Sequence, residues 1–130
     1  MNSALDLHDS FVAEVRQIDG TLNLRLAPAV VHRSPGTPGV SPGEVFAQDA
    51  QLSFRGVQAP SPIIASPGRI SDGSVQVNGV AHSVLALPFL LAGAIEATIQ
   101  FQSGSCLSVT ASAVECLPFG DAQYVEPFAG

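Results

Sequence analysis

The side chains best suited to chemistry stand together near the N-terminus, at His8, Asp9 and Ser10. In a hydrolase, the histidine would act as the base, the carboxylate would orient it, and the serine would be the nucleophile. Adjacent residues of an extended strand point to opposite faces, so His8 and Asp9 are not expected to orient each other. We expect instead that Asp9 accepts backbone amides and fixes the start of the first strand.

Three other residues with binding chemistry lie far from this cluster in the sequence. His32 and Arg33 precede a segment rich in proline and glycine, and His82 lies in an apolar run. The three histidines lack the i, i+2 or i, i+4 spacing of paired metal ligands, so the sequence predicts no metal site. We therefore expect neither an enzyme nor a cofactor, and we take five residues as candidates for binding: His8, Asp9, His32, Arg33 and His82.

Composition limits both the fold and the partners. The 130 residues are 46% hydrophobic and 12% charged, as in a single globular domain, which we expect to span residues 1–130. The net charge is −6, so no basic surface for nucleic acid is expected. No signal peptide or membrane-length apolar run is visible, which favours a soluble, cytoplasmic protein. Cys106 and Cys116 are expected to be free thiols, because ten residues of one strand would separate them by about 33 Å.

Asp19-Gly20, a dipeptide typical of two-residue turns, centres the first predicted hairpin on residues 9–26. An amphipathic helix over residues 7–18 is the alternative, because the apolar residues there also have helical spacing. The turn favours the strand. Its register predicts three pairs: Val15 with Leu24, Ala13 with Leu26, and Glu14 with Arg25.

Two further hairpins follow. Residues 73–84 turn at Asn78-Gly79, which pairs Val77 with Val80 and Val75 with His82. Residues 94–102 and 106–114 are joined by Ser-Gly-Ser, and an odd loop length is required to keep their apolar residues on one face. A three-residue loop predicts that Ile95, Ala97, Ile99 and Phe101 lie opposite Ala113, Ala111, Val109 and Leu107.

The segments between the hairpins are less regular. Residues 32–43 and 59–68, rich in proline, glycine and serine, are expected to be exposed loops, the second with Ile63-Ile64 as an apolar plug. A strand is expected over residues 48–57. Residues 85–93 have no clean period and predict either a short buried helix or a strand bent at Pro88.

Together these elements predict an all-β fold of about seven antiparallel strands, in a sandwich or small barrel, with at most one short helix. Residues 117–120 are expected to stop the last strand. Residues 121–130 are expected to form a flexible tail or an edge strand. The chain has few charges with which to protect a sheet edge, so edge pairing into a homodimer is expected.

Three short motifs give the chain a resemblance to known proteins. They are Leu7-His8-Asp9-Ser10 directly before a hairpin, a late Gly…Phe…Ser-Gly hairpin over residues 93–114, and Ala-Gln-Tyr-Val-Glu-Pro-Phe at residues 122–128. In these features the chain resembles small all-β bacterial proteins of uncharacterised function. The resemblance implies an immunity-type or accessory partner protein and brings no catalytic chemistry.

Our main hypothesis is therefore a non-enzymatic protein-interaction module, which binds through a sheet edge or through the loops at residues 32–43 and 59–68. The alternative is a small-molecule binder or minor hydrolase that uses a barrel mouth around residues 85–91 and His82. A structural subunit of a larger assembly is a third possibility.

Overall fold

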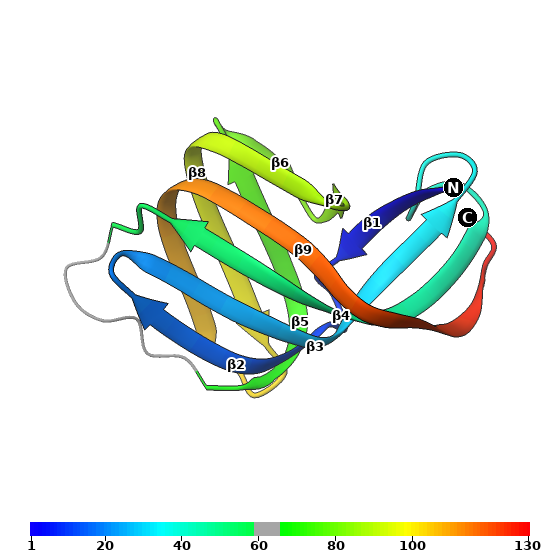
Figure 1. Cartoon of the computed structure of the whole chain (residues 1–130), viewed down its shortest axis with the longest axis horizontal. Coiled ribbons are helices and arrows are strands. Elements are labelled where there is room, and N and C mark those ends of the chain that lie inside the picture. Colours follow the sequence, from blue (N-terminus) through cyan, green and yellow to red (C-terminus); the bar gives the residue numbers. More distant parts are fainter. Residues whose placement is uncertain (59–65) are drawn as a thin grey trace.

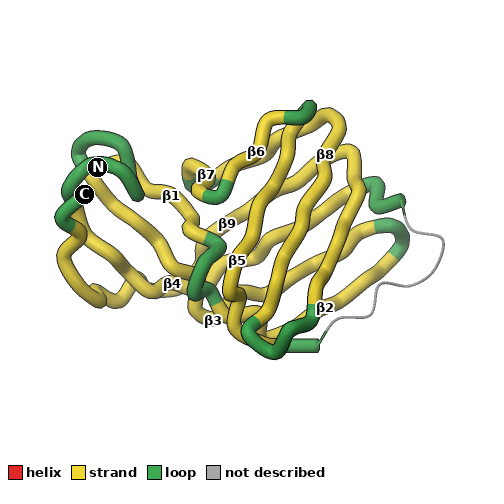
Figure 2. The backbone as a smooth tube through the Cα atoms, turned by 180° about the vertical axis from the view of Figure 1, so that it is seen from behind, coloured by secondary structure: helices red, strands yellow, loops and turns green. Residues whose placement is uncertain are grey.

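The computed structural model describes residues 1–58 and 66–130 of the chain. The described residues form nine strands and no helix, so the expected all-β fold is confirmed, with two strands more than predicted (Figures 1 and 2). None of these residues, therefore, belongs to a helix that could cross a membrane. The strands are β1 (Asn2–Asp6), β2 (Phe11–Ile18), β3 (Thr21–Ser34), β4 (Gly43–Arg55), β5 (Gly68–Val77), β6 (Val80–His82), β7 (Val84–Ala86), β8 (Phe89–Phe101) and β9 (Cys106–Phe128).

Six strands close on themselves, and we call this part the ring. Their order is β2-β5-β8-β9-β4-β3, and β3 pairs back with β2, so each of the six has a neighbour on both sides. All of these pairings are antiparallel. The shortest seam joins β2 to β5 through Phe11 with Arg69 and Val12 with Gly68. The ring is the barrel-like form of the two architectures that the sequence predicts.

Three ring strands continue beyond it and form a second, open sheet, which we call the wing. The wing consists of β1, β7 and the outer parts of β3 (residues 29–34), β4 (residues 43–48) and β9 (residues 121–128), in the order β7-β1-β3-β4-β9. The register shifts where β3 and β4 leave the ring, at residues 26–29 and 47–49, so the strands change course there. Both chain termini lie in the wing (Figure 1).

The first hairpin follows the predicted register except at one residue. Val15 pairs with Leu24 and Glu14 with Arg25, and the helical alternative is wrong. Ala13 does not face Leu26, because a bulge makes Val12 the partner of Leu26. Val12 is completely buried whereas Ala13 is exposed, so the bulge brings the larger apolar side chain into the core.

The other two hairpins keep their predicted faces. Val77 pairs with Val80 and Val75 with His82, as expected. In the last hairpin, Ile99 pairs with Leu107 rather than Val109, so the register is shifted by two residues and the faces are unchanged. The loop ends at Gly104, whose φ of +93° suits the left-handed position that closes a three-residue hairpin loop.

Three boundaries differ from the sequence-based expectations. β3 continues to Ser34 and β4 begins at Gly43, so His32 and Arg33 belong to a strand and only residues 35–42 form the loop. Residues 117–120 do not stop the last strand, and residues 121–128 continue it as an edge strand, which was one of the two forms expected for residues 121–130. Residues 85–93 contain β7 and the start of β8 on either side of Pro88, so the strand alternative is confirmed and the helix alternative is wrong. The expected Ile63-Ile64 plug lies outside the described residues.

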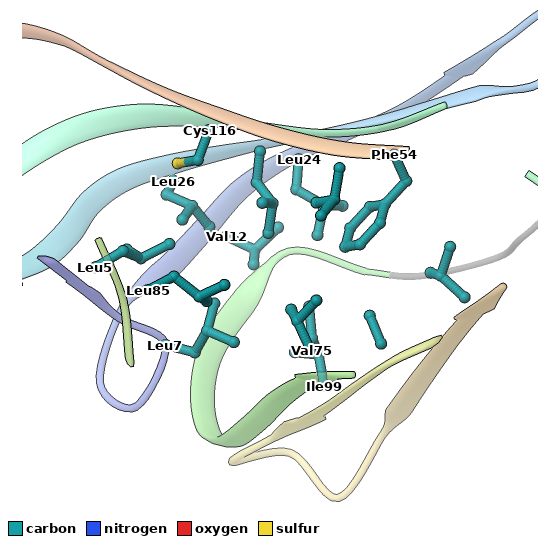
Figure 3. Packing of buried hydrophobic residues seen from close by; sticks show 14 of the residues in the cluster. Leu5, Leu7, Val12, Leu24, Leu26, Phe54, Val75, Leu85, Ile99 and Cys116 are labelled. Atoms are coloured by element: carbon teal, nitrogen blue, oxygen red, sulfur yellow. The ribbon is translucent and has the colours of Figure 1, made fainter. Parts of the chain in front are cut away.

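The core fills the ring with alternate side chains from all six strands. Leu24, Phe54 and Ile99 are completely buried there, and Leu5 and Leu7 lie at one end of the cluster (Figure 3). Gly73 allows Leu7 to approach, because a Cβ atom at residue 73 would lie 3.0 Å from the Cβ of Leu7. A continuous apolar interior therefore supplies most of the driving force for folding.

Both cysteines are free, as predicted, but their surroundings differ. Cys106 is exposed at the start of β9, whereas Cys116 is buried in the core. Burial, with a smaller contribution from the neighbouring Glu115 carboxylate, raises the pKa of the Cys116 thiol to about 12. Cys116 therefore stays protonated at neutral pH and acts as a small apolar residue.

Candidate functional site

His8 and Asp9 lie in the turn between β1 and β2. The His8 Nδ1 atom is 3.4 Å from the Asp9 Oδ2 atom, so the expectation that they do not orient each other is wrong. The reason is that Asp9 has a φ of +69° and is not extended. The amide-accepting role expected of Asp9 belongs to Asp6, whose Oδ1 atom accepts the His8 N–H at 3.1 Å.

Backbone groups of this turn hold β1 and β2 against other strands. The Asp9 N–H donates to the Ile70 carbonyl, and the Ile70 N–H donates to the Ser10 carbonyl. The Ser10 hydroxyl donates to the Asp6 carbonyl at 2.8 Å and accepts the Val30 N–H at 2.9 Å. Because Ser10 is also completely buried, its hydroxyl is engaged in structure and is not presented to a substrate.

His32 lies in the wing, on the face covered by the loop of residues 35–42. Its Nε2 atom is 3.2 Å from the Asp6 Oδ2 atom, and the Phe128 ring meets its ring edge-on with centroids 4.9 Å apart. Its buried Nδ1 atom has no hydrogen-bonding partner among the described residues. Sequence reasoning missed Asp6 and Phe128, because both become neighbours of His32 only through strand pairing across the chain.

Arg33 points to the other face of the wing. Its guanidinium lies 4.4 Å above the centroid of the Phe46 ring, and Phe46 in turn packs edge-on against Tyr124. This is a cation–π contact of the usual kind and ties three strands together. His32 and Arg33 therefore face different surroundings and do not form one site.

The end of the loop of residues 35–42 and the first residue of β4 together contain a serine motif. Residues 39–43 are Gly-Val-Ser-Pro-Gly, the pattern of a nucleophile elbow, which needs a strand, a sharp turn and a helix. No helix follows here, because β4 begins at Gly43. The Ser41 Oγ atom instead accepts the Thr37 N–H at 3.0 Å, so this serine stabilises a turn.

His82 lies on β6 beside an apolar hollow of about 460 Å³. None of the other four predicted binding residues lines this hollow. Within residues 1–58 and 66–130, no group of three or more histidine, cysteine, aspartate or glutamate side chains is arranged to hold a metal ion. The predicted site residues are thus divided among the first turn, the two faces of the wing and the hollow.

The outer face of the ring carries most of the arginines, but their charges are already matched. Arg55 contacts Glu115 at 2.8 Å, and Arg16 contacts Glu14 at the same distance. Arg25 lies 3.7 Å from Asp49 and 5.7 Å from the centroid of the Phe119 ring. This face therefore presents paired charges and no concentration of positive charge for an anion.

The free edge of β9 is the most distinctive surface of the molecule. β8 pairs with β9 only up to Cys116, so residues 117–128 pair with β4 on one side, with register shifts at residues 120–122 and 125, and with no described strand on the other. Four large apolar side chains on this stretch are each 40–55% exposed: Leu117, Phe119, Tyr124 and Val125. Neither lysine nor arginine occurs in it, although such charges commonly protect sheet edges.

Two carboxylates complete this edge. Asp121 and Glu126 are exposed, and neither has an ion-pair partner in the described part of the chain. Pro118 and Pro127 lack an N–H donor, the Gly120 carbonyl accepts a hydrogen bond from the Gln48 side chain, and alternate residues direct their backbone groups toward β4. Unpaired backbone groups therefore face outward at only some of the remaining positions. The resulting surface is extended, partly apolar and acidic.

No family model, curated protein or solved structure matches this chain, so the resemblance drawn from Leu7-His8-Asp9-Ser10 stays a prediction.

Proposed function

We propose that the protein is a non-enzymatic binding module that accepts an extended segment of a partner protein as an additional strand along the free edge of β9. The observation that carries this proposal is that, within the described part of the chain, residues 117–128 pair only with β4 and expose four large apolar side chains. Main-chain hydrogen bonds to such an edge supply affinity, and contacts of alternate side chains supply specificity.

Charge indicates what kind of segment fits. Asp121 and Glu126 lie on the edge without ion-pair partners among the described residues, and the whole chain has a net charge of −6. A second copy paired along this edge would bring carboxylates close to carboxylates, which is unfavourable. A segment in which basic and apolar residues alternate would neutralise the carboxylates and cover the apolar side chains. This consideration favours a basic partner over the homodimer.

Three nucleophilic side chains are engaged in structure, which supports a binding role. The Ser10 hydroxyl is enclosed by two hydrogen bonds, and the thiol of Cys116 is held protonated by a pKa of about 12. Ser41 is engaged in a turn. The exposed Asp9 carboxylate lies beside His8, but neither adjoins the Ser10 hydroxyl on a shared accessible surface, because Ser10 is completely buried.

The proposal is tested with two ten-residue peptides, one alternating arginine and valine and one alternating glutamate and valine. We expect the basic peptide to bind and to protect backbone amides of residues 117–128 from hydrogen exchange, and the acidic peptide not to bind. Val125→Lys should weaken binding about tenfold, because it replaces apolar contact with a charge of the same sign as the probe.

Val80→Lys is the matched control, because Val80 is also an exposed strand valine but lies on β6. It should leave binding of the basic peptide unchanged. Protection located elsewhere, or equal binding of both peptides, contradicts the proposal. A dimer in light scattering that Val125→Lys converts to a monomer would identify a second copy as the occupant and contradict the basic partner.

A further inference from the structure

An apolar hollow opens at the end of the core, between β6, β7 and the start of β8. We call it the His82 hollow, and it has a volume of about 460 Å³. Its lining consists of seven apolar residues and one histidine: Val77, Val80, His82, Val84, Leu85, Ala86, Phe89 and Leu91.

The hollow lies where the hairpin at Asn78-Gly79 places β6 beside β5, outside the six strands of the ring. Val75 is completely buried, and its pairing partner on β6 is His82, which places the imidazole next to the core. β6 and β7 have three residues each, and β7 pairs with β1 rather than with β6 (Figure 1). The sheet is therefore open between them.

The inner residues of the hollow are part of the core. Leu85 and Phe89 are buried and belong to the same cluster as Leu5 and Leu7, and Leu85 lies near both of these in Figure 3. Val80 at the outer end is 60% exposed. A molecule that entered would thus rest on the packed interior and would be flanked by the exposed Val80 and by the partly buried Val77 and Val84. Hollows of this size and lining are typical of small-molecule sites at the mouths of β-barrels.

The lining also defines the chemistry of a ligand. It contains no aspartate, glutamate, lysine or arginine, so an ionic ligand would lose hydration without gaining a counter-charge. The His82 side chain has no hydrogen bond or ion pair among residues 1–58 and 66–130, and it is the only lining side chain able to make one. We propose that the His82 hollow binds a small, neutral, mainly hydrocarbon molecule whose single polar group hydrogen-bonds the imidazole of His82.

The probe is N-phenyl-1-naphthylamine, a neutral aromatic amine with one N–H, whose fluorescence rises in apolar surroundings. We expect the protein to bind it with one site per chain, and 1-octanol to displace it. Val80→Trp should weaken probe binding about tenfold or more by filling the outer end of the hollow. Ile18→Trp, at an apolar residue of similar exposure at the end of β2, should leave probe binding unchanged.

His82→Phe separates the hydrogen bond from the apolar contact, because it keeps a planar ring and removes the polar atoms. Displacement of the probe by 1-octanol should weaken about two- to tenfold, whereas displacement by octane should not change. Ala86→Leu is a second filling variant at an exposed residue of β7, and it serves if Val80→Trp proves unstable by circular dichroism.

Equal probe affinity in the wild type and in both filling variants overturns the proposal. Displacement by octanoate as effective as displacement by 1-octanol overturns the assignment of a neutral ligand. One probe per two chains, together with a dimer in light scattering, assigns the hollow to an interface with a second copy and also overturns it. None of these outcomes bears on the edge of β9, because no lining residue belongs to that strand.

Discussion

The ring and the wing share three strands, yet they are stabilised differently. In the ring, each strand is paired on both sides, and side chains such as Phe54 and Ile99 fill the enclosed space. In the wing, the sheet is open, and individual side-chain contacts, such as Asp6 with His32 and Arg33 with Phe46, tie its strands together. Closure gives the ring its stability, whereas the open sheet leaves the wing with the free edge of β9, for which we have proposed a partner.

The largest expected effect contrasts one phenylalanine from each region. Phe54→Ala should lower the free energy of unfolding by about 3–5 kcal/mol, because it leaves a cavity in the ring core. Phe128→Ala should cost about 1 kcal/mol, because it removes one partly buried ring contact with His32 in the wing. Urea unfolding followed by circular dichroism measures both. Equal losses would mean that the wing is packed as tightly as the ring.

Gly73→Ala probes the junction between the two regions. The new Cβ would lie 3.0 Å from the Cβ of Leu7, which links β1 of the wing to the ring, so a loss of about 1–3 kcal/mol is expected. The control is Gly68→Ala, whose Cβ would meet the Phe101 ring at an ordinary 3.5 Å and should change stability by no more than about 0.5 kcal/mol. Thermal unfolding compares the two variants. Similar behaviour of both would show that Leu7 can move away freely.

Two aspartates near the N-terminus separate a buried wing contact from an exposed one. Asp6→Ala should cost about 1–3 kcal/mol, because it leaves the largely buried His32 ring without its hydrogen-bonding partner. Asp9→Asn should change stability by no more than about 0.5 kcal/mol, because asparagine also accepts the positive φ at residue 9 and because Asp9 and His8 are both more than half exposed. Chemical denaturation distinguishes them. An Asp9→Asn loss as large as that of Asp6→Ala would contradict this division.

The smallest effect at neutral pH concerns Cys116 in the ring. In the native protein a thiol reagent should modify Cys106 and leave Cys116 unmodified, because Cys116 is buried and its pKa is raised from 9.0 to about 12. Between these values the unfolded chain loses the thiol proton and the folded chain keeps it. Cys116 should therefore lower stability by about 1 kcal/mol as the pH rises from 9 to 10. Cys116→Ala should lack this part of the pH dependence.

The sequence predicted what local chemistry determines and missed what distant strands determine. Asp19-Gly20 and Asn78-Gly79 set their registers because those residues accept a positive φ. The continuity of β9 through residues 117–120 was not predicted, because Pro118 and Gly120 normally interrupt strands and the pairing of residues 121–128 with β4 is a non-local contact. His32 was placed in a loop because prolines follow it, and its burial depends on that loop folding back over it.

The sequence predicted which type of site to expect but not which strand carries it. The scarcity of charge indicated an unprotected edge, but nothing local identified β9 as the strand that carries it. The mouth at residues 85–91 with His82 was expected as an alternative, and the structure does place a hollow there. Its inner residues, Leu85 and Phe89, could not be distinguished from ordinary core residues by pattern alone.

The turn at Leu7-His8-Asp9-Ser10 connects strands of the ring with strands of the wing through hydrogen bonds. Its backbone joins β2 to β5 at Ile70, next to a seam of only two residue pairs, and its serine fastens β1 to β3 at Val30. A chain shortened by its first ten residues would therefore keep the long strands but lose the hydrogen bonds that help to hold the ring closed between β2 and β5. Such a truncated protein is expected to expose the sides of β2 and β5 and to polymerise through them.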